Sequence, residues 1–321
     1  GNDGMALNDD WLALTVEETL EPALPICDPH HHLWDSRPEY IAPRYLLDEI
    51  LEDLNSGHNV VATVFIECGA MFKAERPEAL RCIGEIEFVN GIRAMSASGR
   101  YGEARVAAGI VGTADLKLGN AVAEVLDAQI AAGVGHFRGI RLGATWHESA
   151  EVPNHRTDPP EGLYALPAFR EGFAHLAPRG LSFEAWCYQT QIPELVELAR
   201  AFPETTIVLD HFGGPLGIGP YAGKGDEVYA DWRQAIGPLA ECRNVVAKLG
   251  GIAMDVNGFG WHEDERPPGS EVLMQATRRY YEDTIERFGP ERCMFESNFP
   301  VDKLSCSYNV LWNSFKRLTT G

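Results

Sequence analysis

The sequence lacks the features that mark several large classes of protein. No apolar run approaches the roughly 20 residues that a membrane helix needs, and no apolar signal segment stands near the N-terminus. Basic residues are few, with 27 Lys and Arg against 47 Asp and Glu, so the formal net charge is −20. This balance argues against nucleic acid and anionic membranes as partners, because both bind clustered Lys and Arg.

Cysteine shows no pairing pattern. The seven cysteines are odd in number, widely spaced and without a C-x-x-C motif. Several lie in apolar runs, where a reduced cysteine behaves as a small hydrophobic residue. We therefore expect a reducing compartment, the cytoplasm.

The chain also lacks repeats, low-complexity tracts and Ser/Gly-rich linkers. We expect an N-terminal extension over residues 1–24, followed by one domain over residues 25–321. The opening GNDGMALNDD has Gly rather than Met at position 1, which favours an engineered start. A homo-oligomer is compatible with this composition.

Eight short β-rich apolar runs recur along the chain, and most are continuous rather than alternating in hydrophobicity. Such runs are typical of parallel strands that are covered on both faces. The predicted strands span residues 25–33, 60–68, 104–112, 137–143, 181–188, 205–212, 244–251 and 292–300.

A predicted helix follows each predicted strand. Pro193 stands in the first turn of one helix, while Ser270 as N-cap and Gly289 as C′ residue bound another. Eight β–α pairs in one series predict an α/β fold, a single-domain (β/α)8 TIM barrel. A doubly wound open sheet is the alternative, but it usually has fewer strands and no G-x-G-x-x-G follows the first one. The predicted helices span residues 44–56, 76–97, 118–133, 167–178, 191–202, 227–241, 270–288 and 304–318.

Polar residues gather where the predicted strands end, which is where such barrels carry their chemistry. Long Gly/Pro-rich loops over residues 143–166, 213–226 and 251–269 lie on the same side and could wall a pocket. The residues at the strand ends are His30, His32, Glu67, Arg141, Gln189, His211, Lys248 and Asn298.

The segment CDPHHHLWD contains three consecutive histidines. Because side chains alternate along a strand, His30 and His32 share one face and His31 points to the other. Two imidazoles on one face, with His211 as a third, could bind one metal ion or act as proton-transfer groups. Each histidine taken singly is also compatible with a packing role.

The ordered set D-x-H-x-H near the first strand end, DHFGGP after the sixth and FESNFPVD at the eighth resembles the amidohydrolase superfamily. The resemblance is to its "amidohydrolase 2" branch, which includes lactonases acting on sugar lactones and on 2-pyrone-4,6-dicarboxylate. It spans the chain from about residue 25 to the end. It implies that His30, His32 and His211 occupy the positions of the family's histidines and are ligands of a divalent metal, zinc or manganese.

Two positions depart from the pattern that the resemblance implies. Gln189 stands where a metal-binding histidine is common, and Asn298 stands where an aspartate usually acts as ligand or base. An amide cannot serve as a general base, so a metal-free site is an alternative. The base would then be one of the histidines, Asp302, or less plausibly Glu67 or Glu296. For a buried Glu296 we expect a cationic partner, Lys248 or Arg141.

Several residues are candidates for substrate binding. Arg141 could bind a carboxylate through two parallel hydrogen bonds, although an ion pair inside the barrel explains it equally well. Lys248 could hold a carboxylate or an oxyanion, and Tyr45 could donate a hydrogen bond. Trp34 and its aromatic neighbours on the rim suit a flat cyclic substrate. Gln189 and Glu67 complete the predicted binding set; the other rim residues are Trp146, His147, Trp186 and Tyr188.

Together these features predict a hydrolase that opens a small lactone by attack of water on the ring carbonyl. The predicted catalytic residues are His30, His32, His211, Asn298 and Asp302, and the substrate is a small molecule, a carboxylated or sugar-derived lactone. Two other functions fit the sequence. One is a metal-dependent decarboxylase of an unsaturated carboxylic acid, and the other is a catalytically silent barrel that binds a small molecule.

Overall fold

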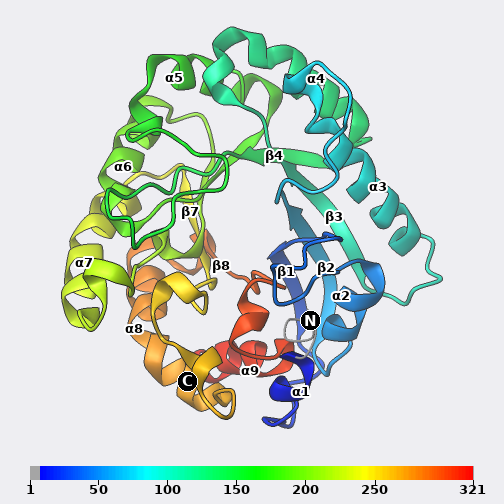
Figure 1. Ribbon diagram of the computed structural model, residues 1–321, viewed down its shortest axis with the longest axis vertical. Helices are drawn as coiled ribbons and strands as arrows, with labels where there is room; N and C mark the ends of the chain where they lie inside the picture. The colour runs from blue at the N-terminus through cyan, green and yellow to red at the C-terminus, as the bar shows by residue number, and fades with distance from the viewer. Residues whose placement is uncertain (1–7, 321) are drawn as a thin grey trace.

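The computed structural model describes residues 8–320, and its centre is a single sheet of eight parallel strands in the order β1 to β8. The sheet curls into a nearly closed barrel with helices around its outside (Figure 1), which confirms the predicted (β/α)8 barrel. The strands are β1 Pro25–His31, β2 Asn59–Ile66, β3 Arg105–Gly112, β4 Phe137–Arg141, β5 Ser182–Ala185, β6 Ile207–Leu209, β7 Val245–Leu249 and β8 Cys293–Phe295.

One α-helix follows each strand, as predicted. Every strand except β3 ends at least two residues before its predicted end because the chain turns into loops that carry polar side chains. A short helix, α1 Asn8–Leu12, precedes the barrel. The barrel helices are α2 Leu47–Leu54, α3 Ile83–Ala97, α4 Val122–Ala132, α5 Pro167–Phe173, α6 Ile192–Ala201, α7 Gly225–Glu241, α8 Ser270–Phe288 and α9 Tyr308–Leu318.

The prediction that Ser270 caps α8 is wrong. Ser270 is the first residue of the helix and Gly269 takes the cap position. The Ser270 hydroxyl instead donates to Glu17 Oε1 at 2.6 Å, and its backbone N–H donates to Glu17 Oε2 at 2.7 Å. A carboxylate from the N-terminal segment therefore satisfies this helix end.

The two faces of the strands differ in chemistry. In β7, Lys248 points into the barrel and reaches Glu184 of β5, so its neighbours Ala247 and Leu249 point outward. Both outward residues are fully buried in the apolar core. The core thus lies between the strands and the helices, whereas the inside of the barrel holds ionisable groups.

The residues before β1 pack on the outside of the barrel. Lys316 of α9 donates through Nζ to the carbonyl oxygens of Leu20 and Glu21, both at 2.7 Å. Of the opening GNDGMALNDD, residues 1–7, including the Gly1 that favoured an engineered start, lie outside the described residues, and its last three residues belong to α1. Among the helices of residues 8–320, none has the length and apolar character needed to cross a membrane.

The barrel closes between β1 and the segment that follows β8. His32 donates its backbone N–H to the Phe299 carbonyl at 2.8 Å, and Asn298 donates to the His30 carbonyl at 2.9 Å. Behind these bonds the fully buried Asp28 carboxylate accepts from the Tyr308 hydroxyl at 2.9 Å and from the Ser297 N–H at 3.1 Å. Asp28 therefore joins β1, the end of β8 and α9.

We expect Tyr308→Phe to lower the free energy of unfolding by about 1–3 kcal/mol, because it leaves a buried Asp28 oxygen without its partner. Tyr164→Phe is the matched control: the Tyr164 hydroxyl is buried and has no hydrogen-bond partner within residues 8–320. Its removal should leave stability unchanged or raise it. Urea unfolding of both variants measures the difference, and equal losses would contradict the role given to Asp28.

Candidate active site

The three predicted histidines meet inside the carboxyl end of the barrel. His30 lies in β1, His32 directly follows it, and His211 follows β6. The His30 ring centroid lies 5.1 Å from that of His32 and 4.6 Å from that of His211. His31 points away and its Nε2 lies 2.8 Å from the Thr63 hydroxyl, as the alternation along a strand predicts.

Backbone geometry at two positions places the His211 ring. His211 itself has φ 54°, in the left-handed region that few residues other than glycine adopt. Gly251, with φ 66°, lies against the ring, and a Cβ atom there would come within 2.0 Å of His211 Nδ1. Only glycine at position 251 therefore leaves room for the imidazole.

Burial keeps all three imidazoles neutral. It lowers the pKa of His30 and His32 well below 6.5, with help from the cations Lys248 and Arg141 respectively, and that of His211 to about 3. His32 Nδ1 lies 2.7 Å from the Ile66 carbonyl oxygen, which can only accept a hydrogen bond. The His32 hydrogen is therefore on Nδ1, and Nε2 keeps its lone pair.

Arg141 belongs to a chain of ion pairs. Its Nε lies 3.0 Å from Glu67 Oε1 and its Nη1 lies 3.2 Å from Asp210 Oδ2. Arg156, from the long loop after β4, reaches the other Glu67 oxygen at 2.7 Å. Burial raises the pKa of Glu67, but the guanidinium groups of Arg156 and Arg141 outweigh it and lower the pKa to about 2. The structure thus gives Arg141 two carboxylate partners from the protein itself.

Glu296 has a different partner from the cation that was expected. Its Oε1 lies 2.7 Å from His211 Nδ1 and 3.5 Å from His30 Nδ1. Lys248 instead pairs with Glu184 at 2.5 Å. The expected pairing of Glu296 with Lys248 or Arg141 is therefore corrected: each cation lies closer to another carboxylate. Burial raises the pKa of Glu296 well above 4.5, so a neutral acid beside His211 avoids an unpaired charge.

Asn298 and Asp302 form a buried pair after β8. Asn298 Nδ2 donates to Asp302 Oδ1 at 2.8 Å, and the Ala253 N–H donates to Asp302 Oδ2 at 3.2 Å. Burial raises the pKa of Asp302 to about 8. Asp302 is therefore mostly protonated at neutral pH, and it is suited to give a proton rather than to take one.

The remaining predicted binding residues have partners within the fold. Trp34 stacks on His32, with ring centroids 6.1 Å apart, and its indole N–H donates to the Ala42 carbonyl. The Tyr45 hydroxyl donates to Asp53 Oδ2 at 2.6 Å, and Gln189 Oε1 accepts from the Leu216 N–H at 3.0 Å. Trp34 thus covers the histidines, whereas Tyr45 and Gln189 use these polar groups to hold the surrounding loops.

Sequence reasoning missed Glu184, Asp210 and Arg156. A signal existed for two of them, since Glu184 stands in a predicted strand and Asp210 directly precedes His211 in another. Acidic residues inside apolar runs need a partner when buried. Arg156 carries no such signal, because it lies in a long loop whose path only the folded chain defines.

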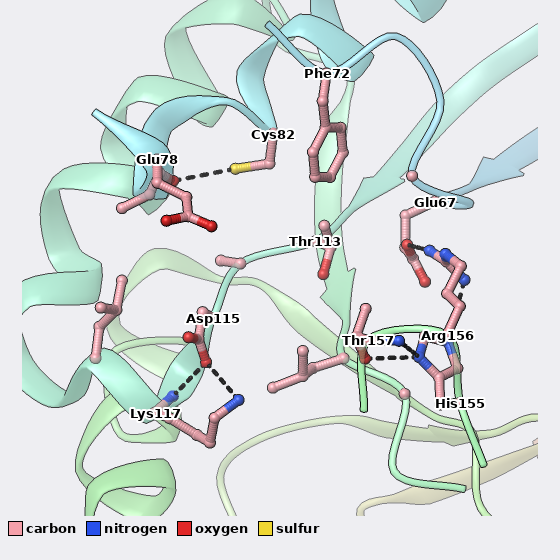
Figure 2. A pocket seen from close by; sticks show the side chains of 16 residues that line it. Glu67, Phe72, Glu78, Cys82, Thr113, Asp115, Lys117, His155, Arg156 and Thr157 are labelled. Carbon is pink, nitrogen blue, oxygen red and sulfur yellow. Dashed lines mark hydrogen bonds and ion pairs between the residues drawn. The ribbon is translucent and has the colours of Figure 1, made fainter. Parts of the chain in front are cut away.

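A cavity of about 670 Å³ opens at the carboxyl ends of β2, β3 and β4 (Figure 2). Glu67 and Arg156 form one side of it, and Thr113, Asp115 and Lys117 lie on another. Arg141 connects this cavity to the histidines, because it contacts Glu67 and its Nη1 lies 3.5 Å from His30 Nε2. The histidines themselves are closed off, with at most 3% of each residue exposed.

In the described part of the chain, two groups of side chains inside the barrel have the composition of a metal site: His30, His211 and Glu296, and His30, Glu184 and Asp210. In the first group, His211 Nδ1 and Glu296 Oε1 are buried and lie 2.7 Å apart, but neither has a hydrogen bond of good geometry to the other or to any other group within residues 8–320. These two atoms fit a divalent ion. The third, His30, fits less well because Lys248 Nζ lies 3.1 Å from its Nδ1. His32, expected as a ligand, belongs to neither group.

Comparison with known proteins places this site in context. A protein-family model described as amidohydrolase matches residues 27–320. The protein y4mH of Sinorhizobium fredii, which has no assigned function, is 32% identical over 314 residues, covering 92% of each chain. An L-fucono-1,5-lactonase of Burkholderia multivorans is 27% identical over 215 residues, 67% of this chain and 64% of the lactonase.

Solved structures share the fold. A crystal structure of a Burkholderia multivorans amidohydrolase with bound HEPES has a TM-score of 0.67 and 22% identity, covering 92% of this chain and 91% of that one. A second crystal form of that amidohydrolase, with bound zinc, has a TM-score of 0.65 and 21% identity over the same shares.

We expect Gly251→Ala to displace the His211 ring and to lower stability more than Gly223→Ala does. Both glycines have positive φ, 66° and 74°, but a Cβ atom at Gly223 meets nothing within 4 Å. Gly223→Ala should therefore lower the free energy of unfolding only by the strain of a left-handed residue other than glycine, about 1–2 kcal/mol. Urea unfolding compares the two, and an equal loss would show that the ring tolerates the added methyl group.

We expect Asp302→Asn to flatten the pH dependence of stability. The Asp302 pKa is about 8 in the fold against 3.8 in the unfolded chain, so between these values the folded state holds a proton that the unfolded state has released. The wild type therefore loses stability as pH rises across this window. Urea unfolding at about pH 5 and about pH 8 should show a smaller difference for the variant, and an unchanged difference would refute the raised pKa.

Proposed function

The chain belongs to the amidohydrolase family, and from this premise we propose that it is a hydrolase of small lactones. Family membership and lactonase-named relatives support a hydrolase. The observation that carries the lactone proposal is the meeting of three neutral imidazoles at the carboxyl end of the barrel. A neutral imidazole has a nitrogen lone pair that can accept a proton from water as the new C–O bond forms, and its low pKa then favours transfer of that proton to the leaving group.

In the proposed reaction His32 is the general base. Its Nδ1–H is held by the Ile66 carbonyl, so the lone pair on Nε2 is available. Water attacks the ring carbonyl carbon while His32 Nε2 takes one of its protons. The ring C–O bond then breaks, and the proton passes from the His32 imidazolium to the leaving alkoxide. Asp302, protonated at neutral pH, is a second proton donor.

The carbonyl oxygen gains negative charge during attack and needs hydrogen-bond donors. Lys248 Nζ occupies the Nδ1 side of His30 at 3.1 Å, so the His30 hydrogen is on Nε2 and can donate to that oxygen. The Arg141 guanidinium lies next to the same nitrogen, at 3.5 Å. We assign His30 and Arg141 to stabilising the oxyanion, with Lys248 behind them.

The cations that line the cavity are already paired with acidic side chains, which favours a sugar-derived lactone over a carboxylated one as the substrate. Arg156 pairs with Glu67, and Lys117 pairs with Asp115, along the cavity wall. A substrate carboxylate would have to displace one of these acids. Hydroxyl groups of an uncharged lactone would instead find both donors and acceptors along that wall.

A single divalent ion, zinc or manganese, is part of this proposal. His211 and Glu296 would hold it, and His30 would join them only by releasing Lys248. When bound, such an ion polarises a carbonyl or activates a water molecule.

The test is to incubate the protein with a panel of neutral and acidic lactones. A pH indicator measures the acid that is released when a lactone ring opens. We expect His32→Gln to lower kcat/KM by about 10²–10⁴, the usual contribution of a general base. His136→Gln is the matched control, since His136 precedes β4 at the opposite end of the barrel. It should leave turnover unchanged.

Failure of the wild type to open any lactone in the panel would overturn the proposed activity. Equal activity of wild type and His32→Gln would retain the lactonase but remove His32 as its base.

A further inference from the structure

Lys248 carries a buried positive charge in the middle of the barrel. The residue is 2% exposed. Its Nζ lies 2.9 Å from the Pro29 carbonyl oxygen, 3.1 Å from His30 Nδ1 and 2.5 Å from Glu184 Oε1. Asp210 Oδ1 lies 4.0 Å away on the same side. An ammonium group has three hydrogens, and the three nearer contacts use all of them.

These neighbours coincide with one of the two groups that have the composition of a metal site. His30, Glu184 and Asp210 bring an imidazole nitrogen and two carboxylate oxygens within 4.8 Å of one another. Lys248 Nζ lies within 4.0 Å of an atom from each of them. Asp210 Oδ1 is buried and has no hydrogen-bond partner within residues 8–320, so it faces the ammonium with a free lone pair.

We propose that the Lys248 ammonium is a built-in cation that takes the place of a metal ion in the His30–Glu184–Asp210 cluster. An ion bound there would need the space and the lone pairs that the ammonium now uses. The cluster is thus a latent metal site, closed by a side chain of the same protein. This inference concerns charge inside the barrel and does not depend on the identity of the substrate.

The ammonium also fixes the tautomer of His30, which makes Lys248 a positioning residue. Lys248 Nζ lies next to Nδ1, and Arg141 Nη1 lies 3.5 Å from Nε2. Both cationic groups can only donate, and a neutral imidazole can accept at one nitrogen only. The shorter contact is that of Lys248, so Nδ1 accepts and Nε2 carries the hydrogen.

The Lys248 ammonium limits the number of metal ions that the protein can bind, because it occupies the His30–Glu184–Asp210 cluster. With the second cluster filled by Lys248, the other group within residues 8–320 that has the composition of a metal site is the one that contains His211 Nδ1 and Glu296 Oε1. The wild-type barrel should therefore bind at most one divalent ion. Removal of the ammonium would open a second site and release Nδ1 of His30.

The test is metal uptake by Lys248→Met, which keeps the length of the side chain and removes its charge. Protein is incubated with Zn²⁺ or Mn²⁺ alone, dialysed, and analysed by elemental mass spectrometry. We expect one ion more per chain than in the wild type, and a thermal midpoint that rises with added Zn²⁺ in the variant only. Lys316→Met is the matched control, because Lys316 is also buried but lies on α9 outside the barrel. It should bind as many ions as the wild type.

A second variant keeps the proposal falsifiable. Adding Glu184→Gln to Lys248→Met should return the ion count to the wild-type value, because it removes a ligand of the opened cluster. A folded Lys248→Met protein with no extra ion would overturn the proposal. So would an extra ion that persists in the double variant.

If Lys248→Met does not fold, the wild type still provides a readout. In protein labelled with ¹⁵N histidine, the His30 signals, assigned with His30→Gln, should show an unprotonated Nδ1 and a protonated Nε2. A proton on Nδ1 would overturn the proposal, since the ammonium could not then donate to that atom.

Discussion

Pairing of opposite charges inside the barrel is the constraint on which the rest of the structure depends. An isolated charge moved from water into this interior would cost several kcal/mol. Lys248 is balanced by Glu184, and Arg141 by Glu67 and Asp210. Because these residues come from five different strands or strand ends, each pair also links two strands that are not adjacent in the sheet. The polar interior therefore contributes to holding the strands in place as well as to chemistry.

The protein has two different interiors: an apolar layer between the strands and the helices, and a polar one inside the barrel where the charges are paired. Ala247 and Leu249, on either side of Lys248, face the helices and are apolar and fully buried. Burial of the apolar layer supplies the hydrophobic stabilisation that the barrel needs. The inward faces can then hold acids, bases and neutral imidazoles.

Much of the fold could be predicted from the sequence, because alternation of apolar runs and helical segments is a local signal. The ends of the strands were harder to predict. The strand expected over residues 205–212 extends only over Ile207–Leu209, because the backbone turns at His211. The position of Ser270 within its helix depended on Glu17, which is 253 residues away. Propensity near Ser270 contains no information about that contact.

The candidate site was predictable as far as it depends on strand ends. His30, His32 and His211 come together because parallel strands bring their carboxyl ends to one edge of the barrel. Partner choice was not predictable, because it depends on register around the barrel: Glu296 contacts His211, and Lys248 contacts Glu184. Tyr45 shows the same limit, since its hydroxyl donates to Asp53 on α2.

The closure of the barrel has a consequence for its motions. Seven neighbouring strand pairs are joined by parallel ladders, of which the first three contain register shifts. At the seam of the barrel, β1 meets the segment after β8 through the hydrogen bonds at His32 and Asn298 and an isolated bridge between His31 and Phe299. Local opening favours regions with few cooperative hydrogen bonds. The seam carries His30 and His32, while His211 follows β6, whose ladders with β5 and β7 have no register shift. Breathing of the seam would therefore change the spacing of the imidazoles and admit small molecules to a site that is otherwise closed.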